Sequence, residues 1–202
     1  MDEHALIVNA SAGDLDAFNH LVLAYQDMLY NTALRIVGDD ALACDATQDA
    51  FISAFKNLAS FRGGSFKAWL LRTVTNACYD ELRRQKRRPA VPLEPASAEE
   101  DEIESPRWLA DPSMSPAEQM EADELEHAIQ HCLEQLPDDF RAAVVLADIQ
   151  GLNYQEVSQV LRTPLGTIKS RLARARLRLR TCLQDFWELL PEVFRLQRET
   201  LP

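Results

Sequence analysis

The sequence predicts an all-α protein in which two small helical domains are joined by an acidic, proline-rich linker. Apolar residues recur at helical spacing on both sides of the centre of the 202-residue chain, and no strand pattern precedes the centre. The formal net charge of −11 is concentrated between Glu94 and Glu126, where twelve acidic residues face a single arginine, and six prolines fall between Pro89 and Pro116. Charge and proline at this density are typical of an extended linker.

We therefore divide the chain into a first domain at 1–90, a linker at 91–122, a second domain at 123–184 and a C-terminal extension at 185–202. Two interpretations of the linker remain open. It is either an inert, solubilising tether or an acidic strand that occupies a cationic channel on a partner. The apolar extension either caps the second domain or forms an extra helix that binds a partner.

The first domain begins with helices whose apolar residues share one face. The first of these faces consists of Phe18, Leu21, Val22, Tyr25 and Leu29. A second run, from Ala33 to Val37, stops at the turn-forming residues 38–40, which are Gly-Asp-Asp. The apolar side of the next helix consists of Ala50, Phe51, Ala54, Phe55 and Leu58.

A short loop with two glycines, residues 60–65, leads from there into a helix that Ser65 is placed to cap. This helix carries Trp69, Arg72 and Asn76 and ends in the basic run 83–88. An aromatic residue beside flexible glycines and a basic helix suits the capture of unstacked bases and of a single-strand backbone. The alternative, that Phe61 and Trp69 are simply core residues, stays open.

Residues 154–180 have the pattern of a helix-turn-helix. A short helix through Val157 is followed by Thr163, which can cap a new helix whose first residue is Pro164. In this second helix the spacing predicts one narrow buried stripe, formed by Ile168, Leu172, Ala175 and Leu179.

The face opposite this stripe is lined by small and polar residues with cations on both rims. The centre of the face consists of Gly166, Thr167, Ser170, Ala173 and Arg174, and the rims consist of Lys169, Arg176 and Arg180 on one side and Arg171 and Arg178 on the other. Small residues let a helix backbone approach DNA, and polar side chains reach base edges while rim cations meet the phosphates. The alternative is a solvated basic helix face.

Several other kinds of protein are excluded by the composition. The N-terminus is acidic and no apolar run approaches the ~20 residues that span a bilayer, so we expect a cytoplasmic protein without direct membrane insertion. Cys44, Cys78, Cys132 and Cys182 form no C-x-x-C pair, and we interpret them as reduced, mostly buried thiols. No acid cluster, phosphate loop or nucleophile with a base is visible, so an enzyme is not predicted.

We predict no metal and no cofactor. His127 and His131 are four residues apart, with Glu124 one turn earlier and Cys132 adjacent, but no fourth ligand is evident. Surface histidines are the preferred interpretation.

Taken together, these segments resemble the two-domain bacterial sigma factors of the extracytoplasmic-function group, which direct RNA polymerase to promoters. Residues 45–51 look like the helix of that family that binds core polymerase, and residues 66–80 with the arginines that follow look like its promoter-melting helix. Residues 136–141, 151–157 and 166–171 are similar to the domain that reads the upstream promoter element. The match covers both domains.

The resemblance implies three sets of functional residues. The set for core RNA polymerase is Asp45, Gln48, Asp49, Phe51 and Phe55. The set for the downstream element of promoter DNA, where a flipped base is captured, is Phe61, Arg62, Ser65, Arg72, Asn76, Arg83 and Arg84. The set for the upstream element is Tyr154, Gln155, Thr167, Lys169, Ser170, Arg171 and Arg174.

The resemblance also implies an anti-sigma factor, often anchored in the membrane, that holds the protein inactive. Two departures from the family are a base-capturing loop about one residue shorter than in many members and an outward-facing Leu177. The alternative function is a stand-alone helix-turn-helix regulator, which usually needs a dimer because half-sites mirror protein symmetry.

Overall fold

The computed structural model describes residues 2–87 and 116–190, and these contain helices and no strand. The predicted all-α class is confirmed. The elements in chain order are α1 (Glu3–Ser11), α2 (Leu15–Val37), α3 (Asp40–Asn57), η1 (Leu58–Ser60), α4 (Phe66–Arg87), α5 (Pro116–Glu134), α6 (Asp138–Val144), the π-helical turn η3 (Val145–Ile149), α7 (Tyr154–Val160), α8 (Leu165–Leu183) and η4 (Gln184–Leu189).

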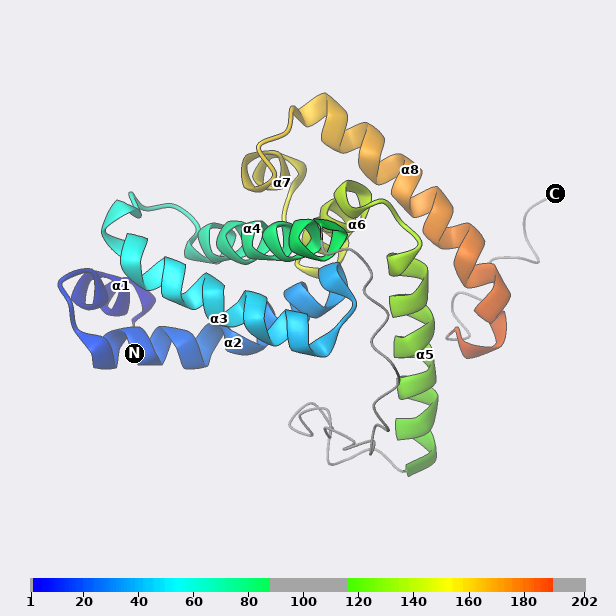
Figure 1. Ribbon diagram of the computed structural model, residues 1–202, viewed down its shortest axis with the longest axis horizontal. Helices are drawn as coiled ribbons and strands as arrows, with labels where there is room; N and C mark the ends of the chain where they lie inside the picture. The colour runs from blue at the N-terminus through cyan, green and yellow to red at the C-terminus, as the bar shows by residue number, and fades with distance from the viewer. Residues whose placement is uncertain (1, 88–115, 191–202) are drawn as a thin grey trace.

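The first domain is a bundle in which α2, α3 and α4 pack side by side and α1 closes one end (Figure 1). The two apolar runs predicted before residue 38 belong to one continuous helix, α2, which begins after its cap Asp14 and ends at Gly38. Phe18, Leu21 and Leu29 are buried, as their shared face predicts. Leu70, Leu71 and Val74, also nearly or fully buried, contribute the apolar face of α4 to the same core.

Gly38 occupies a position that a larger residue would not fit. Its backbone has a φ of 77°, in the left-handed region that glycine adopts without a steric penalty. A Cβ atom there would also lie 2.7 Å from Oε1 of Glu134 on α5. The turn between α2 and α3 therefore lies close to the Glu134 side chain of α5.

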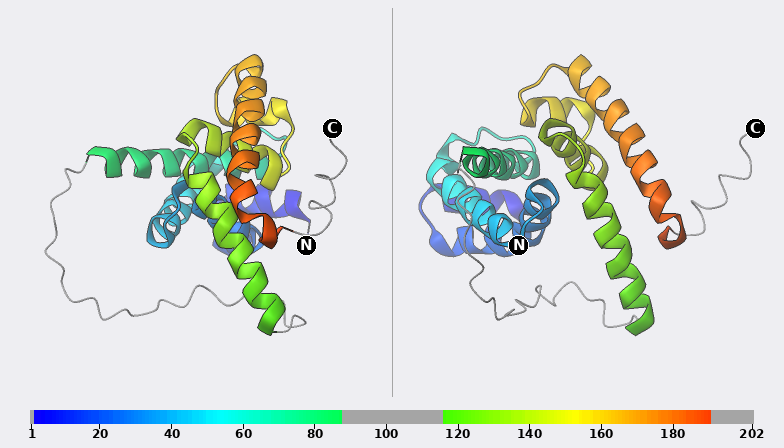
Figure 2. Two further views of the ribbon diagram at one scale, coloured as in Figure 1. Left: turned by 90° about the vertical axis from the view of Figure 1, so that its right-hand side faces the viewer. Right: turned by 45° about the vertical axis from the view of Figure 1, so that its right-hand side comes forward.

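The second domain wraps α5, α6, α7 and α8 around its own apolar residues, and its core is continuous with that of the first domain. Figure 1 shows α7 lying beside α4, and Figure 2 shows the N-terminal end of α5 projecting past the first domain. Helix α5 begins at Pro116, within the range that the sequence assigns to the linker. The rest of that linker and most of the predicted C-terminal extension, at 88–115 and 191–202, lie outside the described residues.

A buried arginine holds the two domains together. The side chain of Arg141 on α6 is 7% exposed, and its guanidinium donates a 2.9 Å hydrogen bond to the carbonyl oxygen of Ile36 in the last turn of α2. The same guanidinium forms a 3.1 Å ion pair with Asp138. More exposed polar contacts surround this joint: Arg35 pairs with Glu126 at 2.7 Å, and Lys86 pairs with Asp138.

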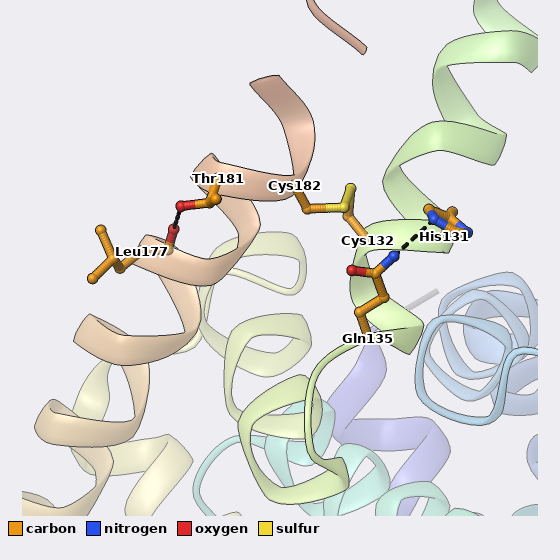
Figure 3. The surroundings of a disulfide bond; sticks show 6 residues. All are labelled: His131, Cys132, Gln135, Leu177, Thr181 and Cys182. Carbon is orange, nitrogen blue, oxygen red and sulfur yellow. Dashed lines mark hydrogen bonds between the residues drawn. A yellow bond between two sulfur atoms is a disulfide. The ribbon is translucent and has the colours of Figure 1, made fainter. Parts of the chain in front are cut away.

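The prediction that all four cysteines are reduced thiols is wrong for two of them. Cys132 on α5 and Cys182 in the last turn of α8 form a disulfide that spans 50 residues of sequence (Figure 3). Packing brings these helices together, which no spacing in the sequence reveals. Cys44 and Cys78 are free, and Cys78 is buried as predicted, whereas Cys44 is exposed. Burial raises the pKa of the Cys78 thiol to about 12.

Among residues 2–87 and 116–190, no helix combines the length and the apolar composition needed to cross a membrane.

Candidate nucleic-acid interface

An open groove of about 820 Å³ runs between α3 and α4. Trp69, Arg72 and Asn76 line it from α4, and Arg62 lines it from the loop that precedes this helix. Arg62, Arg72 and Asn76 are residues that the sequence assigns to the downstream promoter element, and the structure brings them to one hollow together with Trp69. Arg162, from the turn between α7 and α8, lines the same groove, so the second domain borders it directly.

Three aromatic rings pack together beside this groove, and Trp69 is the one that lines it. The Phe66 side chain is buried at 2% exposure, and its ring stacks on that of Trp69 with 5.6 Å between centroids. The ring of Phe61 lies 5.4 Å from Phe66 and 5.6 Å from Trp69. Phe61 and Trp69 are half-buried against the core, so each combines a packing role with a ring edge or face that is still accessible. Aromatic pairs at such distances hold one another in fixed orientation.

The loop before α4 presents these rings because of its backbone. Gly63 and Gly64 have φ values of 89° and 91°, a region that is strained for other residues, and nothing lies within 4 Å of where their Cβ atoms would stand. The hydroxyl of Ser65 accepts a 3.1 Å hydrogen bond from the backbone N–H of Ala68, which confirms the predicted cap. Phe61 stands between Ser60 and Arg62, which line the groove, and its ring contacts Trp69, so it lies beside the groove.

Cations of α4 are held by acidic residues one turn away. Arg83 pairs with Asp80 and Arg84 pairs with Glu81, each at 2.9 Å, and both arginines are more than 60% exposed. Lys67 instead donates a 2.7 Å hydrogen bond to the carbonyl oxygen of Gln150 in the second domain. Part of the positive charge of this helix therefore serves the contact between domains.

Helix α3 presents an acidic and apolar face outward. Asp45, Gln48 and Asp49 are exposed and lie on adjacent turns. Phe55 is 40% exposed and packs edge-on against Phe18, while Phe51 is half-buried. Ile52, 44% exposed on the same side, was not among the predicted residues. Its spacing of three and four residues from Asp49 and Gln48 is the signal that places it on this face of the helix.

The second helix of the helix-turn-helix starts differently from the prediction. Thr163 does not cap α8: its hydroxyl donates to the carbonyl oxygen of Leu161 at 3.1 Å, and α8 begins at Leu165 after Pro164. Ser158 closes the turn instead, by donating a 2.6 Å hydrogen bond to the carbonyl oxygen of Thr163. The first helix is capped by Asn153, whose side chain and that of Glu156 form a reciprocal capping box.

The predicted stripe of α8 is confirmed in its first three members. Ile168, Leu172 and Ala175 are buried, and Leu179 is half-buried. On the outward side, Lys169, Ser170 and Arg174 are exposed, whereas Thr167 and Arg171 are half-buried. Tyr154 and Gln155 lie exposed at the start of α7. The seven residues predicted for the upstream element therefore lie on two consecutive helices.

Acidic residues form ion pairs with two rim arginines of α8. Arg171 pairs with Asp139 at 2.6 Å, and Arg176 forms two hydrogen bonds to Asp148, at 2.6 and 2.9 Å. Arg176 also donates to the hydroxyl of Tyr154 at 2.9 Å. These hydrogen bonds, foremost those that Arg176 donates to Asp148, raise the pKa of Arg176, so its guanidinium stays charged. The sequence did not predict the acidic partners, because Asp139 and Asp148 precede their arginines by 32 and 28 residues.

Tyr79 marks where the two surfaces approach each other. Its hydroxyl lies 3.5 Å from Asp139, the acid that also holds Arg171. Burial is the main cause that raises the pKa of Tyr79, so this phenol stays neutral.

The histidine pair does not converge on a shared ligand position. Nδ1 of His127 lies 2.7 Å from the carbonyl oxygen of Asp123, and Nε2 of His131 lies 2.8 Å from the amide of Gln135. Within the part of the chain that the structure describes, no cluster of three or more His, Cys, Asp or Glu residues is arranged to hold a metal ion.

Comparison with known proteins matches both halves of the chain to one group. Residues 21–88 match sigma-70 region 2, and residues 126–179 match sigma-70 region 4. The RNA polymerase sigma-H factor of Pseudomonas aeruginosa is 37% identical over 184 residues, which cover 90% of this chain and 94% of that protein. The ECF RNA polymerase sigma-E factor of Escherichia coli is 36% identical over 181 residues, which cover 87% and 91%.

Two solved structures share the fold. A structure of CnrH in complex with the cytosolic domain of CnrY has a TM-score of 0.64 at 24% identity, covering 91% of this chain and 97% of that one. The sigma factor RpoE in complex with the anti-sigma factor NepR from Bartonella quintana has a TM-score of 0.62 at 24% identity, covering 84% and 98%.

Proposed function

This chain belongs to the sigma-70 family as a sigma factor of the extracytoplasmic-function type, a non-enzymatic factor for transcription initiation by RNA polymerase, and we propose that its two domains divide the promoter between them. The first domain melts the downstream element and holds the unpaired strand. The second domain reads the upstream element as intact duplex. Core polymerase fixes the distance between them.

The groove between α3 and α4 carries the first half of this proposal. Trp69 lines this groove and the Phe61 ring packs against Trp69 beside it. A base stacked on an aromatic side chain contributes about 1 to 3 kcal/mol. Asn76 and Arg72 line the path beyond the rings, where an amide can reach base edges and a guanidinium can reach phosphates. Stacking favours the open state only, because a paired base has no free face to offer.

The outward side of α8 supports the second half. Its centre, from Gly166 to Ala173, is small and exposed, so the backbone can enter the major groove. Arg174 and Lys169 extend from this side, and Tyr154 and Gln155 of α7 add polar groups at its edge. Each bidentate base contact here would discriminate by about 1 to 3 kcal/mol.

We further propose that core polymerase docks on α3 through Asp45, Gln48, Asp49, Phe51 and Phe55, with Ile52 as an added apolar contact. Lys67 and Lys86 of α4 are engaged by the second domain, and Arg162 borders the groove. A strand could follow α4 fully only after these contacts part. Polymerase binding would therefore both position the domains and free the groove.

An anti-sigma factor is the second protein partner that we propose. RpoE of Bartonella quintana is a sigma factor solved in complex with the anti-sigma factor NepR, and its fold is that of this chain. A partner that holds α4 and α7 together would keep the groove closed, and a membrane-anchored one would also hold the factor at the inner face of the membrane.

The test is run-off transcription with purified bacterial core polymerase on genomic fragments of the source organism. We expect discrete promoter-dependent transcripts with the native protein and at least a tenfold loss with Asp49→Arg, because the charge reversal opposes a basic partner surface. Asp27→Arg, an equally exposed acid on α2, is the matched control and should keep activity. DNA binding without polymerase, and no transcript, would instead favour a stand-alone regulator.

A further inference from the structure

The disulfide between α5 and α8 is not needed by the function proposed above. Cys132 is buried at 1% exposure on α5, whereas Cys182 in the last turn of α8 is only half-buried, and their Cα atoms are 5.7 Å apart. Figure 3 shows the two sulfur atoms joined between the helices, with Thr181 and Leu177 on the adjoining turn of α8. The Cys132 residue is therefore buried in the domain, whereas the Cys182 residue lies closer to its surface.

The bond fastens a part of α8 that packing holds weakly. The buried residues of α8 end at Ala175, and beyond it Leu179 and Leu183 are only half-buried. Leu177 is 65% exposed. The last two turns therefore have little apolar area to bury, and the covalent bond to Cys132 is their strongest attachment to the domain.

The segment after the bridge also rests on α5. The ring of Phe186 in η4 lies 5.7 Å from that of His131, and Phe186 and Leu189 line a shallow, mainly apolar groove with His127 and Ala128 of α5. The end of α8 and η4 therefore close on α5 together. Releasing the bond would loosen the attachment of both.

We propose that Cys132 and Cys182 form a reversible redox site whose oxidising substrate is a hydroperoxide. A factor that acts on RNA polymerase and DNA works where disulfides are uncommon and usually transient, so a permanent structural bond is not expected there. The half-buried Cys182 is the sulfur that small reagents reach first. Cys132, held against it by α5, resolves the oxidised form.

The chemistry balances in two steps. The thiolate of Cys182 attacks the O–O bond of the hydroperoxide, which gives a sulfenic acid on Cys182 and releases the alcohol, or water when the oxidant is hydrogen peroxide. The thiolate of Cys132 then attacks the Cys182 sulfur, forms the S–S bond and expels hydroxide, which takes up a proton to become water. Two electrons pass from the thiols to the peroxide, and a dithiol reverses the oxidation by exchange.

The effect on DNA reading is indirect, and this part rests on the proposed function. Cys182 follows Ser170 by twelve residues, or about 18 Å along the helix, so the bridge cannot touch the DNA that α8 reads. Oxidation fixes the far end of the reading helix to α5. The oxidised factor would stay competent longer under stress, with its choice of bases unchanged.

The test compares the full chain after treatment with hydrogen peroxide and after reduction with dithiothreitol, each followed by removal of the reagent. Alkylation under denaturing conditions should count two thiols after oxidation and four after reduction, because Cys44 and Cys78 are free in both. We expect the oxidised protein to melt about 10 °C or more above the reduced one. Amide exchange at residues 176–183 should be at least about tenfold faster after reduction.

Two variants separate the bridge from general effects of the reagents. Cys182→Ser should show the low melting temperature and fast exchange under both treatments, while Cys44→Ser, which removes an exposed thiol on α3, should respond as the native protein does. Equal thiol counts after the two treatments, or equal melting and exchange, would overturn the proposal. So would a bond that dithiothreitol reduces only in denaturant, since that is a permanent structural disulfide.

Transcription is a separate readout. We expect the half-life of run-off activity under heat stress to be at least threefold longer for the oxidised native protein, with the same start sites. No difference in half-life would overturn the effect on activity. If no transcript forms in either state, the proposed function fails, whereas the thiol count, melting and exchange results still decide the redox site.

Discussion

The groove of the first domain and the outward side of α8 both carry arginines and polar side chains, but the groove is concave and the α8 surface is convex. The groove is a hollow of about 820 Å³ lined by Trp69, against which Phe61 packs, and by the cations Arg62, Arg72 and Arg84. The α8 side is a convex helix surface with Ser170 and Arg174 exposed along it. A hollow with ring faces suits single bases that have left the duplex, while a convex helix fits the major groove of a duplex that stays paired.

On both surfaces, arginines form ion pairs with nearby acidic residues. Arg84 is paired with Glu81 in the first domain, and Arg171 is paired with Asp139 in the second. Exposed or partly exposed pairs of this kind contribute about 0 to 1 kcal/mol each, so a phosphate can displace the carboxylate at small cost. The acids hold the cations in position without preventing them from binding DNA.

The largest effect that separates the two surfaces is expected from Phe61→Ala. Loss of the Phe61 ring beside the groove should slow promoter opening about 10- to 100-fold, because about 1 to 3 kcal/mol of stacking on the open strand is removed. The measurement is the rate of open-complex formation with core polymerase, followed by permanganate reactivity of unpaired thymines. Binding to the upstream element should not change.

A template with a pre-opened downstream element is the control for that variant. If the ring acts on melting, this template restores most of the activity of Phe61→Ala. Phe61→Leu keeps apolar packing but has no ring face. This variant should therefore open the promoter slowly, while its own melting temperature stays near that of the native protein. Activity that stays low on the pre-opened template would assign Phe61 to the core alone.

A smaller effect is expected from Arg174→Ala on α8. Removal of one base contact should weaken upstream binding by about 1 to 2 kcal/mol, or about 5- to 30-fold, and relax the preference at one base position. Competition between promoter variants for holoenzyme measures both. Arg180→Ala removes an exposed rim arginine that is placed to meet phosphates, so this matched control should leave the base preference unchanged.

The pre-opened template is also a control for Arg174→Ala. It should leave the defect of Arg174→Ala unchanged, because that residue acts on duplex DNA upstream. Rescue of Arg174→Ala by the pre-opened template would mean that the two surfaces are not specialised as proposed.

The smallest effect is expected from Lys169→Gln. A single phosphate contact should be lost, which lowers affinity a few-fold at every sequence and reduces the magnitude of the slope of log affinity against log salt by about 0.9. Titration of fluorescent upstream duplex with holoenzyme at several salt concentrations gives the slope. A change in base preference, with the slope unaltered, would contradict the phosphate assignment.

Local patterns in the sequence predicted the helices and most of their faces correctly. The stripe through Ile168, Leu172 and Ala175 and the Ser65 cap depend on residues within a few positions of each other, where spacing carries the information. Thr163 was assigned wrongly as a cap because the residue type fits that role, whereas its hydroxyl bonds to Leu161 in a turn that Ser158 closes. Residue type alone does not decide between two nearby hydrogen-bond acceptors.

Features that depend on distant residues were not predictable in the same way. The Cys132–Cys182 bridge and the Arg176–Asp148 pair join positions that only the packing of α8 brings together. Arg162 reaches the groove through the contact between domains, which leaves no periodic signal in either half. The candidate site residues were predicted by resemblance, and their surroundings, including the acids that hold them, came from the structure.

The buried guanidinium of Arg141 makes the interface between the two domains sensitive to hydration. A purely apolar contact gains all its stability from excluding water, but this one encloses a charge whose Nε has no hydrogen-bond partner among the described protein atoms. When the domains separate, the charge regains hydration, and that gain offsets part of what the lost contacts supplied. We therefore expect the two domains to pack together in the free protein, and to separate more readily on binding polymerase than they would across a purely apolar interface.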